Sequence, residues 1–193
     1  DDDLTDFPVY VDLSDLSANF WSTTPTSSAF VGTDIRAKTD SGTPTELPRE
    51  LVFASSTAET GELHFKADSI SSTTDTTFRI YYNGTTTGDY DTDDTFGAEN
   101  VWSNNYLLVA HLHEEGSGLT GEYKNSVDFT TNGQGGSGLT SEVPSATTSF
   151  TTLSSRAQYF DGNDDIDFGD NFDLTGNYTL EAWVRPESVS IDG

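Results

Sequence analysis

The densest group of side chains that could bind a metal or act as acids and bases is an acidic run at residues 160–173, which begins FDGNDDIDFGD. Six aspartates follow one another there with no lysine or arginine between them. Calcium takes six to eight oxygen ligands from carboxylates, amides and carbonyls. Asp161, Asn163 and Asp165 offer three such groups in one loop, so we predict a calcium site there. The alternative is a tight turn, in which Asp161 and Gly162 open a β-hairpin and Asp165 points outward from a strand.

A second pattern, AHLHEE, places His111 and His113 two residues apart and just before Glu114. On a strand the two imidazoles would face the same side, and with Glu114 they could bind zinc. Structural zinc takes four protein ligands and catalytic zinc three, whereas His64 is the only other histidine in the chain. We therefore favour the alternative, in which these residues end an ordinary strand and bond to the backbone.

Motifs of known catalytic sites are missing from the sequence. Jelly-roll glycanases of the laminarinase type carry Glu-x-Asp-x-x-Glu on one strand, which places their two carboxylates about 5.5 Å apart. The chain has no such motif, no Gly-x-Ser-x-Gly elbow and no phosphate-binding loop. It also has no cysteine, which excludes both a cysteine nucleophile and a disulfide. We predict that the chain is not an enzyme.

Aromatic side chains give a different kind of candidate site. Sugar rings stack on aromatic faces while amides and carboxylates take the hydroxyl groups. Tyr90 lies in an acidic loop, where we expect it to be the best exposed of the candidate aromatics, and Trp183 alternates with apolar neighbours. We predict glycan binding at Tyr90 and Trp183. The alternative is that most aromatics belong to the core, and we expect about two of the three tryptophans to be structural.

The charge of the chain restricts its partners and its environment. Thirty-three acidic residues face eight basic ones, which gives a formal net charge of -25. Such a surface repels phosphate, so we exclude nucleic acid as a partner, and no apolar run approaches the ~20 residues of a membrane span. Aspartate outnumbers glutamate 22 to 11, and only three lysines occur. This balance is typical of halophilic proteins, whose self-repulsion is screened by salt; an ordinary acidic extracellular protein is the alternative.

Short apolar runs with a period of two predict an all-β fold. Such runs occur at residues 7–13, 62–68, 78–84 and 178–184, and residues 12–21 could hold one short helical turn. Each run has one apolar face, which is typical of half-buried antiparallel strands. An acidic, turn-rich stretch before residue 99 marks the best boundary. We predict two consecutive antiparallel β-sandwiches, residues 1–98 and residues 99–193.

Several motifs resemble known families. LTDFPVYVDL, GTDIRA, TELPRELV and TTFRIYYNG resemble a β-sandwich domain of unknown function that often precedes a jelly roll. VWSNNYLLVAHLHEE, AQYFDGNDDIDFG and YTLEAWVRP resemble the first half of that jelly roll, which is laminin-G-like and concanavalin-like. The resemblance implies a microbial, archaeal or viral surface protein. It also implies an incomplete second domain, so we expect a longer protein or a neighbouring chain to complete it.

The resemblance and the composition together imply an extracellular, cell-surface or virion protein. We expect a non-catalytic recognition or adhesion module that binds cell-surface glycans, as part of a fibre, spike or other surface protein of a salt-adapted host. Calcium would order its loops. The alternatives are a spacer or decoration subunit of a homo-oligomeric filament, capsid or surface layer, whose partners are neighbouring subunits, and an accessory domain of a polysaccharide-degrading enzyme.

Overall fold

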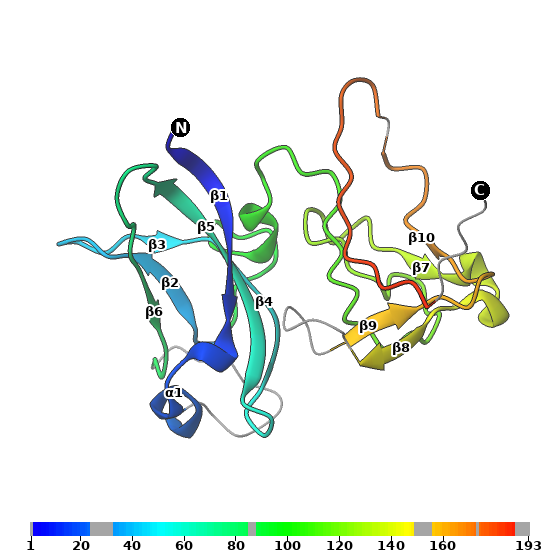
Figure 1. Cartoon of the computed structure of the whole chain (residues 1–193), viewed down its shortest axis with the longest axis horizontal. Helices are drawn as coiled ribbons and strands as arrows, with labels where there is room; N and C mark the ends of the chain where they lie inside the picture. The colour runs from blue at the N-terminus through cyan, green and yellow to red at the C-terminus, as the bar shows by residue number, and fades with distance from the viewer. Residues whose placement is uncertain (1, 24–32, 85–87, 149–155, 173, 188–193) are drawn as a thin grey trace.

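The computed structural model describes residues 2–23, 33–84, 88–148, 156–172 and 174–187 of the chain. Its regular structure consists of antiparallel strands with one short α-helix, which confirms the all-β class. Figure 1 shows the strands of residues 4–81 grouped together and the later strands β7–β10 in a second group. Within the described residues, no helix is both long and apolar enough to cross a membrane.

The first sheet has the strand order β1-β5-β4. Its strands are β1 (Leu4–Asp12), β4 (Arg49–Ser55) and β5 (Thr60–Ile70). The long β5 lies in the middle and pairs with β1 from Leu4↔Ile70 to Asp12↔Glu62. A β-bulge interrupts the β4–β5 pairing between Leu51 and Phe53. The predicted runs at residues 7–13 and 62–68 therefore form strands, as expected from their alternation.

The second sheet has the order β3-β2-β6, formed by Glu46–Leu47, Arg36–Thr39 and Phe78–Tyr81. Both sheets contribute to one hydrophobic cluster, in which Ala37 and Leu47 meet Phe65 and Ala67. This packing covers the inner face of each sheet, and burial of apolar area is the main favourable term in folding.

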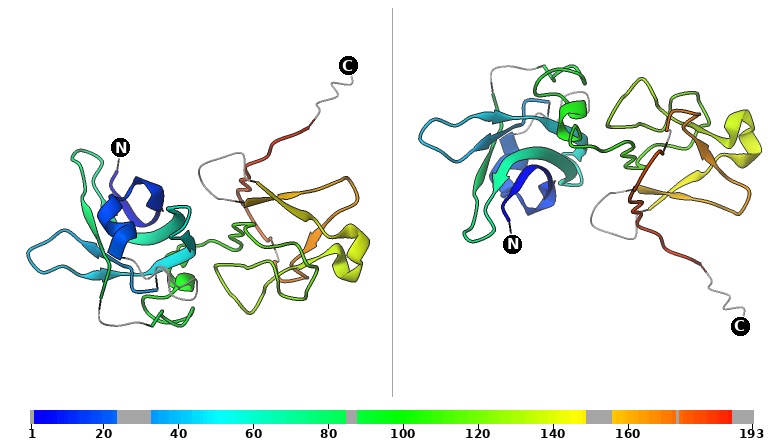
Figure 2. Two further views of the ribbon diagram at one scale, coloured as in Figure 1. Left: turned by 90° about the horizontal axis from the view of Figure 1, so that it is seen from below. Right: turned by 90° about the horizontal axis from the view of Figure 1, so that it is seen from above.

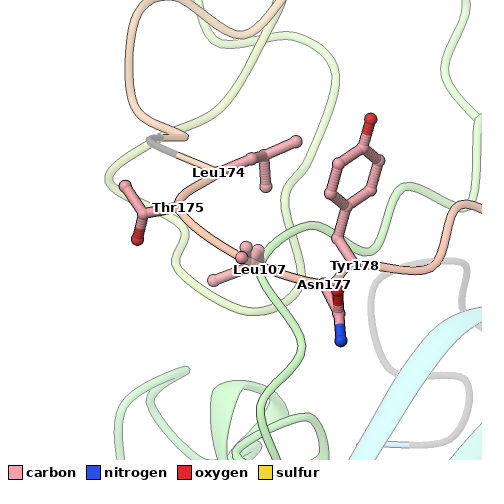
Figure 3. A pocket seen from close by; sticks show the side chains of 6 residues that line it. Leu107, Leu174, Thr175, Asn177 and Tyr178 are labelled. Carbon is pink, nitrogen blue, oxygen red and sulfur yellow. The ribbon is translucent and has the colours of Figure 1, made fainter.

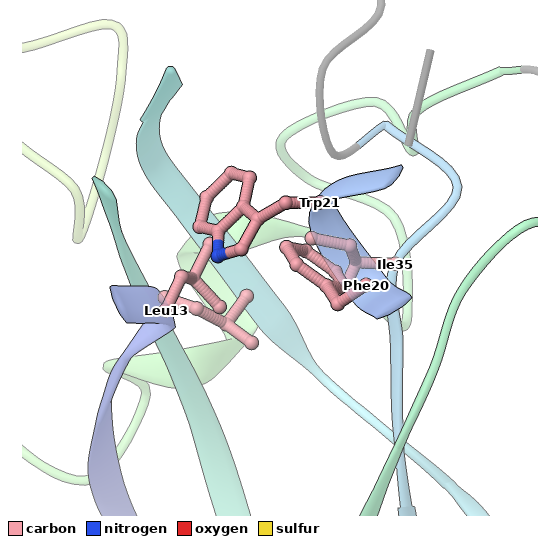
Figure 4. Close-up of a cluster of buried hydrophobic side chains, with 5 residues drawn as sticks. Leu13, Phe20, Trp21 and Ile35 are labelled. Carbon is pink, nitrogen blue, oxygen red and sulfur yellow. The ribbon is translucent and has the colours of Figure 1, made fainter. Parts of the chain in front are cut away.

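A second cluster fills one end of this core. It contains Leu13, Phe20, Trp21, Ile35 and Leu63, drawn in Figure 4. The short helix α1 (Ala18–Thr23) supplies Phe20 and Trp21, whose rings meet edge to face at 4.7 Å. A 3-10 turn, η1 (Leu13–Asp15), precedes the helix. The predicted helical turn within residues 12–21 is thus confirmed, and it serves to insert two large aromatic side chains into the core.

The later part of the chain has short strands. β7 (Gln134–Gly135) pairs with β10 (Ile166–Asp167), and β8 (Ser145–Thr148) pairs with β9 (Arg156–Tyr159). Two 3-10 turns lie beside them, η3 (Gly136–Gly138) and η4 (Thr140–Glu142), whereas the earlier turn η2 (Ala98–Val101) contacts β4 and β5 of the first sheet. The two views of Figure 2 show this group of strands beside the first two sheets, with green chain between them. The jelly-roll form and the division into residues 1–98 and 99–193 stay predictions.

One expected strand does not form. Residues 178–184 belong to a long extended loop, orange to red in Figure 1, and no described strand pairs with them. Leu180 is 88% exposed, Trp183 72% and Val184 77%, so neither side of this segment is buried. The alternation of the sequence was suited to a strand, but a strand needs a neighbour that accepts its backbone hydrogen bonds.

Candidate functional site

The first candidate site lies on the outer face of the β1-β5-β4 sheet. Glu62 and His64 are two residues apart on β5, so their side chains leave the same face of the strand. Leu63 and Phe65 leave the opposite face and enter the core. The β4–β5 register places Glu50 directly opposite His64. One strand pair thereby brings two carboxylates and an imidazole together.

Residues from later in the chain cover this face. The indole of Trp102 donates a hydrogen bond to Oε2 of Glu50 over 2.6 Å, and the Ser126 hydroxyl donates to Oε1 over 2.5 Å. The ring of His111 lies between the two carboxylates, with Nε2 3.1 Å from Glu50 and Nδ1 3.0 Å from Glu62. His64 Nε2 is 2.9 Å from the same Oε1 of Glu62.

The bonds within this cluster change the acidity of its members. Burial alone would raise the pKa of Glu50, but hydrogen bonds from His111, Ser126 and Trp102 outweigh it and lower that pKa. The pKa of Glu62 is lowered in the same way, against burial, by His111 and His64. Burial disfavours a charged His111, yet its bonds to both carboxylates raise its pKa. Both carboxylates are therefore held ionised.

Three donor atoms of the cluster converge. The ligand atoms of Glu62, His64 and His111 all lie within 4.8 Å of one another, the only such group of His, Asp or Glu residues in the described part of the chain. Glu62 is a buried residue whose second oxygen, Oε2, has no hydrogen-bond partner among the described residues. Two imidazoles and one carboxylate are a donor set that suits zinc and related metals.

The zinc arrangement considered from AHLHEE does not form. Leu112 has a φ of 55°, so the backbone between the two histidines is not a strand, and the expected alternation does not apply. His113 stacks on Phe53 at 4.3 Å, and Glu114 accepts a hydrogen bond from the backbone of Lys124. Burial, followed by the nearby charge of Arg156, lowers the pKa of His113. His111 turns instead toward His64, which comes from a distant strand.

The residues predicted to bind calcium lie in a turn between β9 and β10. Asp161 Oδ1 accepts a hydrogen bond from the backbone of Asn163, and Asp165 Oδ2 accepts one from Ser137 over 2.6 Å. The amide of Asn163 donates to the carbonyl of Ser141. The turn is present, but the hairpin alternative is wrong because β9 and β10 pair with different strands. Calcium binding at Asp161, Asn163 and Asp165 stays a prediction.

The two predicted glycan-binding aromatics lie in different surroundings. Tyr90 is half-buried, contrary to expectation: its hydroxyl donates to Glu46, and the guanidinium of Arg36 lies 4.4 Å from its ring centre. With Arg49 and Asp89 it lines a hollow of about 170 Å³. Trp183 is exposed, whereas Trp21 and Trp102 are buried, which confirms that two of the three tryptophans are structural. Glycan binding by either residue stays a prediction.

A second candidate site lies next to Trp183 in the chain. Leu107 and residues 174–178 line an open hollow of about 220 Å³, shown in Figure 3. Leu174 and Leu107 lie at its apolar part, and the ring of Tyr178 projects to one side of it. Thr175 and Asn177 add a hydroxyl and an amide. Tyr178 is 66% exposed. We call Tyr178, Trp183 and the lining of this hollow the aromatic surface.

Sequence reasoning missed most of the buried cluster. Glu50 is the second residue of β4, between Arg49 and the apolar run that begins at Leu51, so its position in the sequence does not mark it as buried. Glu62 and His64 share one face of β5, which was visible from their spacing. Nothing in the sequence connects these residues with Trp102, His111 and Ser126, because the contacts join segments up to 76 positions apart.

Comparison of the chain with protein-family models, curated proteins and solved structures found no match. The laminin-G-like resemblance therefore stays a prediction, and the function is argued from the sites themselves.

Proposed function

We propose that the chain is a non-catalytic recognition module that binds glycans at the aromatic surface, within a longer surface or virion protein of a salt-adapted host. The observation that supports this most is the exposure of Tyr178 beside the hydroxyl of Thr175 and the amide of Asn177, with a second exposed aromatic, Trp183, five residues further along the chain. Aromatic faces stack on sugar rings, and neighbouring polar groups bond to the sugar hydroxyls.

The shape of the hollow favours an extended ligand that lies on the surface. Its volume of about 220 Å³ is below the roughly 300–1,000 Å³ of pockets that enclose a small molecule. One sugar ring would rest against Tyr178, and the remaining rings would extend over the segment that carries Trp183. Single contacts of this kind are weak, and repeated copies on a fibre or cell surface would supply avidity.

Binding to isolated cell-surface glycans in ~2–3 M salt, where surface charge is screened, tests this proposal. We expect Tyr178→Ala and Trp183→Ala each to weaken binding several-fold and up to about tenfold, the range of ~0.5–1.5 kcal/mol typical of aromatic stacking. Tyr81→Ala is the matched control, since Tyr81 is a half-exposed tyrosine on β6. Equal binding by all three variants and the parent chain would exclude the aromatic surface.

The same assay tests the calcium prediction. Calcium at Asp161, Asn163 and Asp165 would order the loop before the aromatic surface, so a chelator and Asp165→Asn should weaken glycan binding to the same extent. The parent chain should also melt at a higher temperature when calcium is added. A melting temperature that calcium leaves unchanged would remove calcium from the proposal without affecting the aromatic surface.

A second candidate function is assembly with neighbouring subunits. It is favoured by the extended backbone of residues 178–184, where Leu180 and Val184 are almost fully exposed and no described strand pairs with the chain. Such a segment can add as a strand to the sheet edge of another copy. Ordered, symmetric oligomers that dissociate in Leu180→Asp, measured by light scattering, would favour this function. A monomer at all concentrations would exclude it.

A further inference from the structure

We propose that Glu62, His64 and His111 form a binding site for one divalent transition-metal ion of the zinc class, which fastens β5 to the segment that follows residue 108. This inference goes beyond recognition at the aromatic surface and rests on different residues. It uses the outer face of the first sheet, where all three histidines of the chain gather.

The main support for this proposal is the position of the three candidate metal-ligand atoms. His64 Nε2 and His111 Nδ1 both point to Oε1 of Glu62, at 2.9 and 3.0 Å, and all three atoms lie within 4.8 Å of one another. Tetrahedral zinc with bonds of about 2.0–2.2 Å holds its ligands roughly 3.3–3.6 Å apart. A small outward movement of the side chains would admit the ion between them.

The surroundings of His111 match those of a metal-bound histidine. Such a histidine binds the metal through one ring nitrogen and donates the other N–H to a carboxylate, which fixes its tautomer and orientation. Here Nδ1 is directed to the other ligands and Nε2 lies 3.1 Å from Glu50. Glu50 is fixed in turn by Trp102 and Ser126. Glu50 is thus a positioning residue and not a ligand.

Charge and unused hydrogen-bonding capacity favour a cation over a plain ion pair. Glu50 and Glu62 bury two negative charges close together, and a divalent ion would balance both. Oε2 of Glu62 has no partner in the described part of the chain. A metal ion can take this oxygen as an additional ligand.

The donor set indicates which metal binds. Calcium and magnesium prefer sites made of oxygen atoms, whereas two imidazoles favour zinc and its neighbours in the first transition row. The side chains of His64 and His111 are only 12% exposed, and that of Glu62 is 6% exposed. Structural zinc takes four donor atoms, so both carboxylate oxygens of Glu62 would bind together with the two imidazoles, and a nearly closed site of this kind suits a metal that crosslinks two segments.

Zinc and cobalt titrations of the full chain in ~2 M NaCl test the proposal. After treatment with a chelator, we expect one equivalent of Zn²⁺ to bind and to raise the melting temperature, with no competition from excess Ca²⁺. Co²⁺ bound in place of zinc should show the intense visible bands of a four-coordinate site with nitrogen ligands. High salt suppresses weak binding of cations to the acidic surface.

His64→Gln removes one proposed ligand, and His113→Gln is its control, because His113 stacks on Phe53 outside the group. We expect His64→Gln to weaken zinc binding at least about 100-fold, since loss of an outer-shell partner alone costs roughly 10–100-fold. His113→Gln should bind zinc as the parent chain does. Equal zinc affinity in both variants would overturn the proposal. If His64→Gln does not fold, the Co²⁺ spectrum of the parent chain still tests the proposal. A spectrum that shows coordination by oxygen atoms alone would overturn it.

Discussion

Glu50 is a buried carboxylate near the start of β4, and three hydrogen-bond donors hold it there. Trp102, His111 and Ser126 reach it from segments 52 to 76 residues away. A buried charge without partners costs several kcal/mol, whereas one with a full set of hydrogen bonds can be retained. This single side chain therefore ties β4 to three points in the later part of the chain.

The free energy of unfolding should depend strongly on Glu50. We expect Glu50→Ala to lower it by about 3–5 kcal/mol, because His111, Trp102 and Ser126 lose a buried partner. Urea denaturation in high salt with a chelator present would measure this loss without any contribution from bound metal. Glu115→Ala is the control, since Glu115 forms an exposed ion pair with Arg156 that should contribute no more than about 1 kcal/mol. Similar losses in both variants would contradict the assigned role of Glu50.

Among the strands, β5 must satisfy two different environments at once, one on each of its faces. It is the central strand of its sheet, and its two faces meet different environments: Leu63 and Phe65 enter the core, and Glu62 and His64 enter the polar cluster. The bulge in β4 brings Phe53 opposite Glu62, where Phe53 stacks on His113. Bulges often redirect side chains near functional sites. A shift of β5 by one residue would exchange its faces, so both environments fix its register.

Truncation of β5 in the core tests this arrangement. Leu63 is fully buried among Leu13, Phe20 and Trp21, so we expect Leu63→Ala to lower the free energy of unfolding by about 2–5 kcal/mol. Leu180→Ala, the same substitution at an almost fully exposed leucine, should change it by less than about 0.5 kcal/mol. Chemical denaturation of both variants would provide the comparison. A small loss in Leu63→Ala would mean that this cluster is not a packed core.

For the molecule as a whole, the main electrostatic feature is the large excess of acidic residues over basic ones. Eight basic residues cannot pair with thirty-three acidic ones, so most of the acidic surface repels itself. The few ion pairs near Tyr90 illustrate how the bases are used: Arg36 and Lys38 share Glu46, and the buried Arg49 binds Asp89. These three bases stabilise one local region, and even if all eight bases were paired, 25 acidic residues would remain without a basic partner.

This imbalance predicts a protein that is stabilised by salt. We expect the melting temperature to rise steadily as NaCl increases from about 0.1 to 2 M, where the Debye length shortens from about 10 Å to less than 3 Å. KCl at equal ionic strength should have the same effect, because screening does not depend on the identity of the cation. A melting temperature independent of salt would favour the alternative, an ordinary acidic extracellular protein.

The local sequence pattern was sufficient to predict the fold class and the main core strands. Period-two alternation located β1, β5 and β6, and the side chains that it assigned to one face of β5 are buried in the structure. The net charge, the absence of cysteine and the number of histidines also follow directly from the composition. These features could be predicted because alternation and composition are local properties of the chain.

The contacts between residues far apart in the chain became visible only in the folded structure. His111 was visible as a potential ligand, but its partners proved to be His64 and Glu62 on β5, not His113 and Glu114 beside it. The strand predicted at residues 178–184 does not form. A strand needs a neighbouring strand to pair with, and the sequence of the segment does not show whether one is present. A binding site or a β-sheet is formed by contacts between segments far apart in the chain. The spacing of residues within one segment does not reveal those contacts.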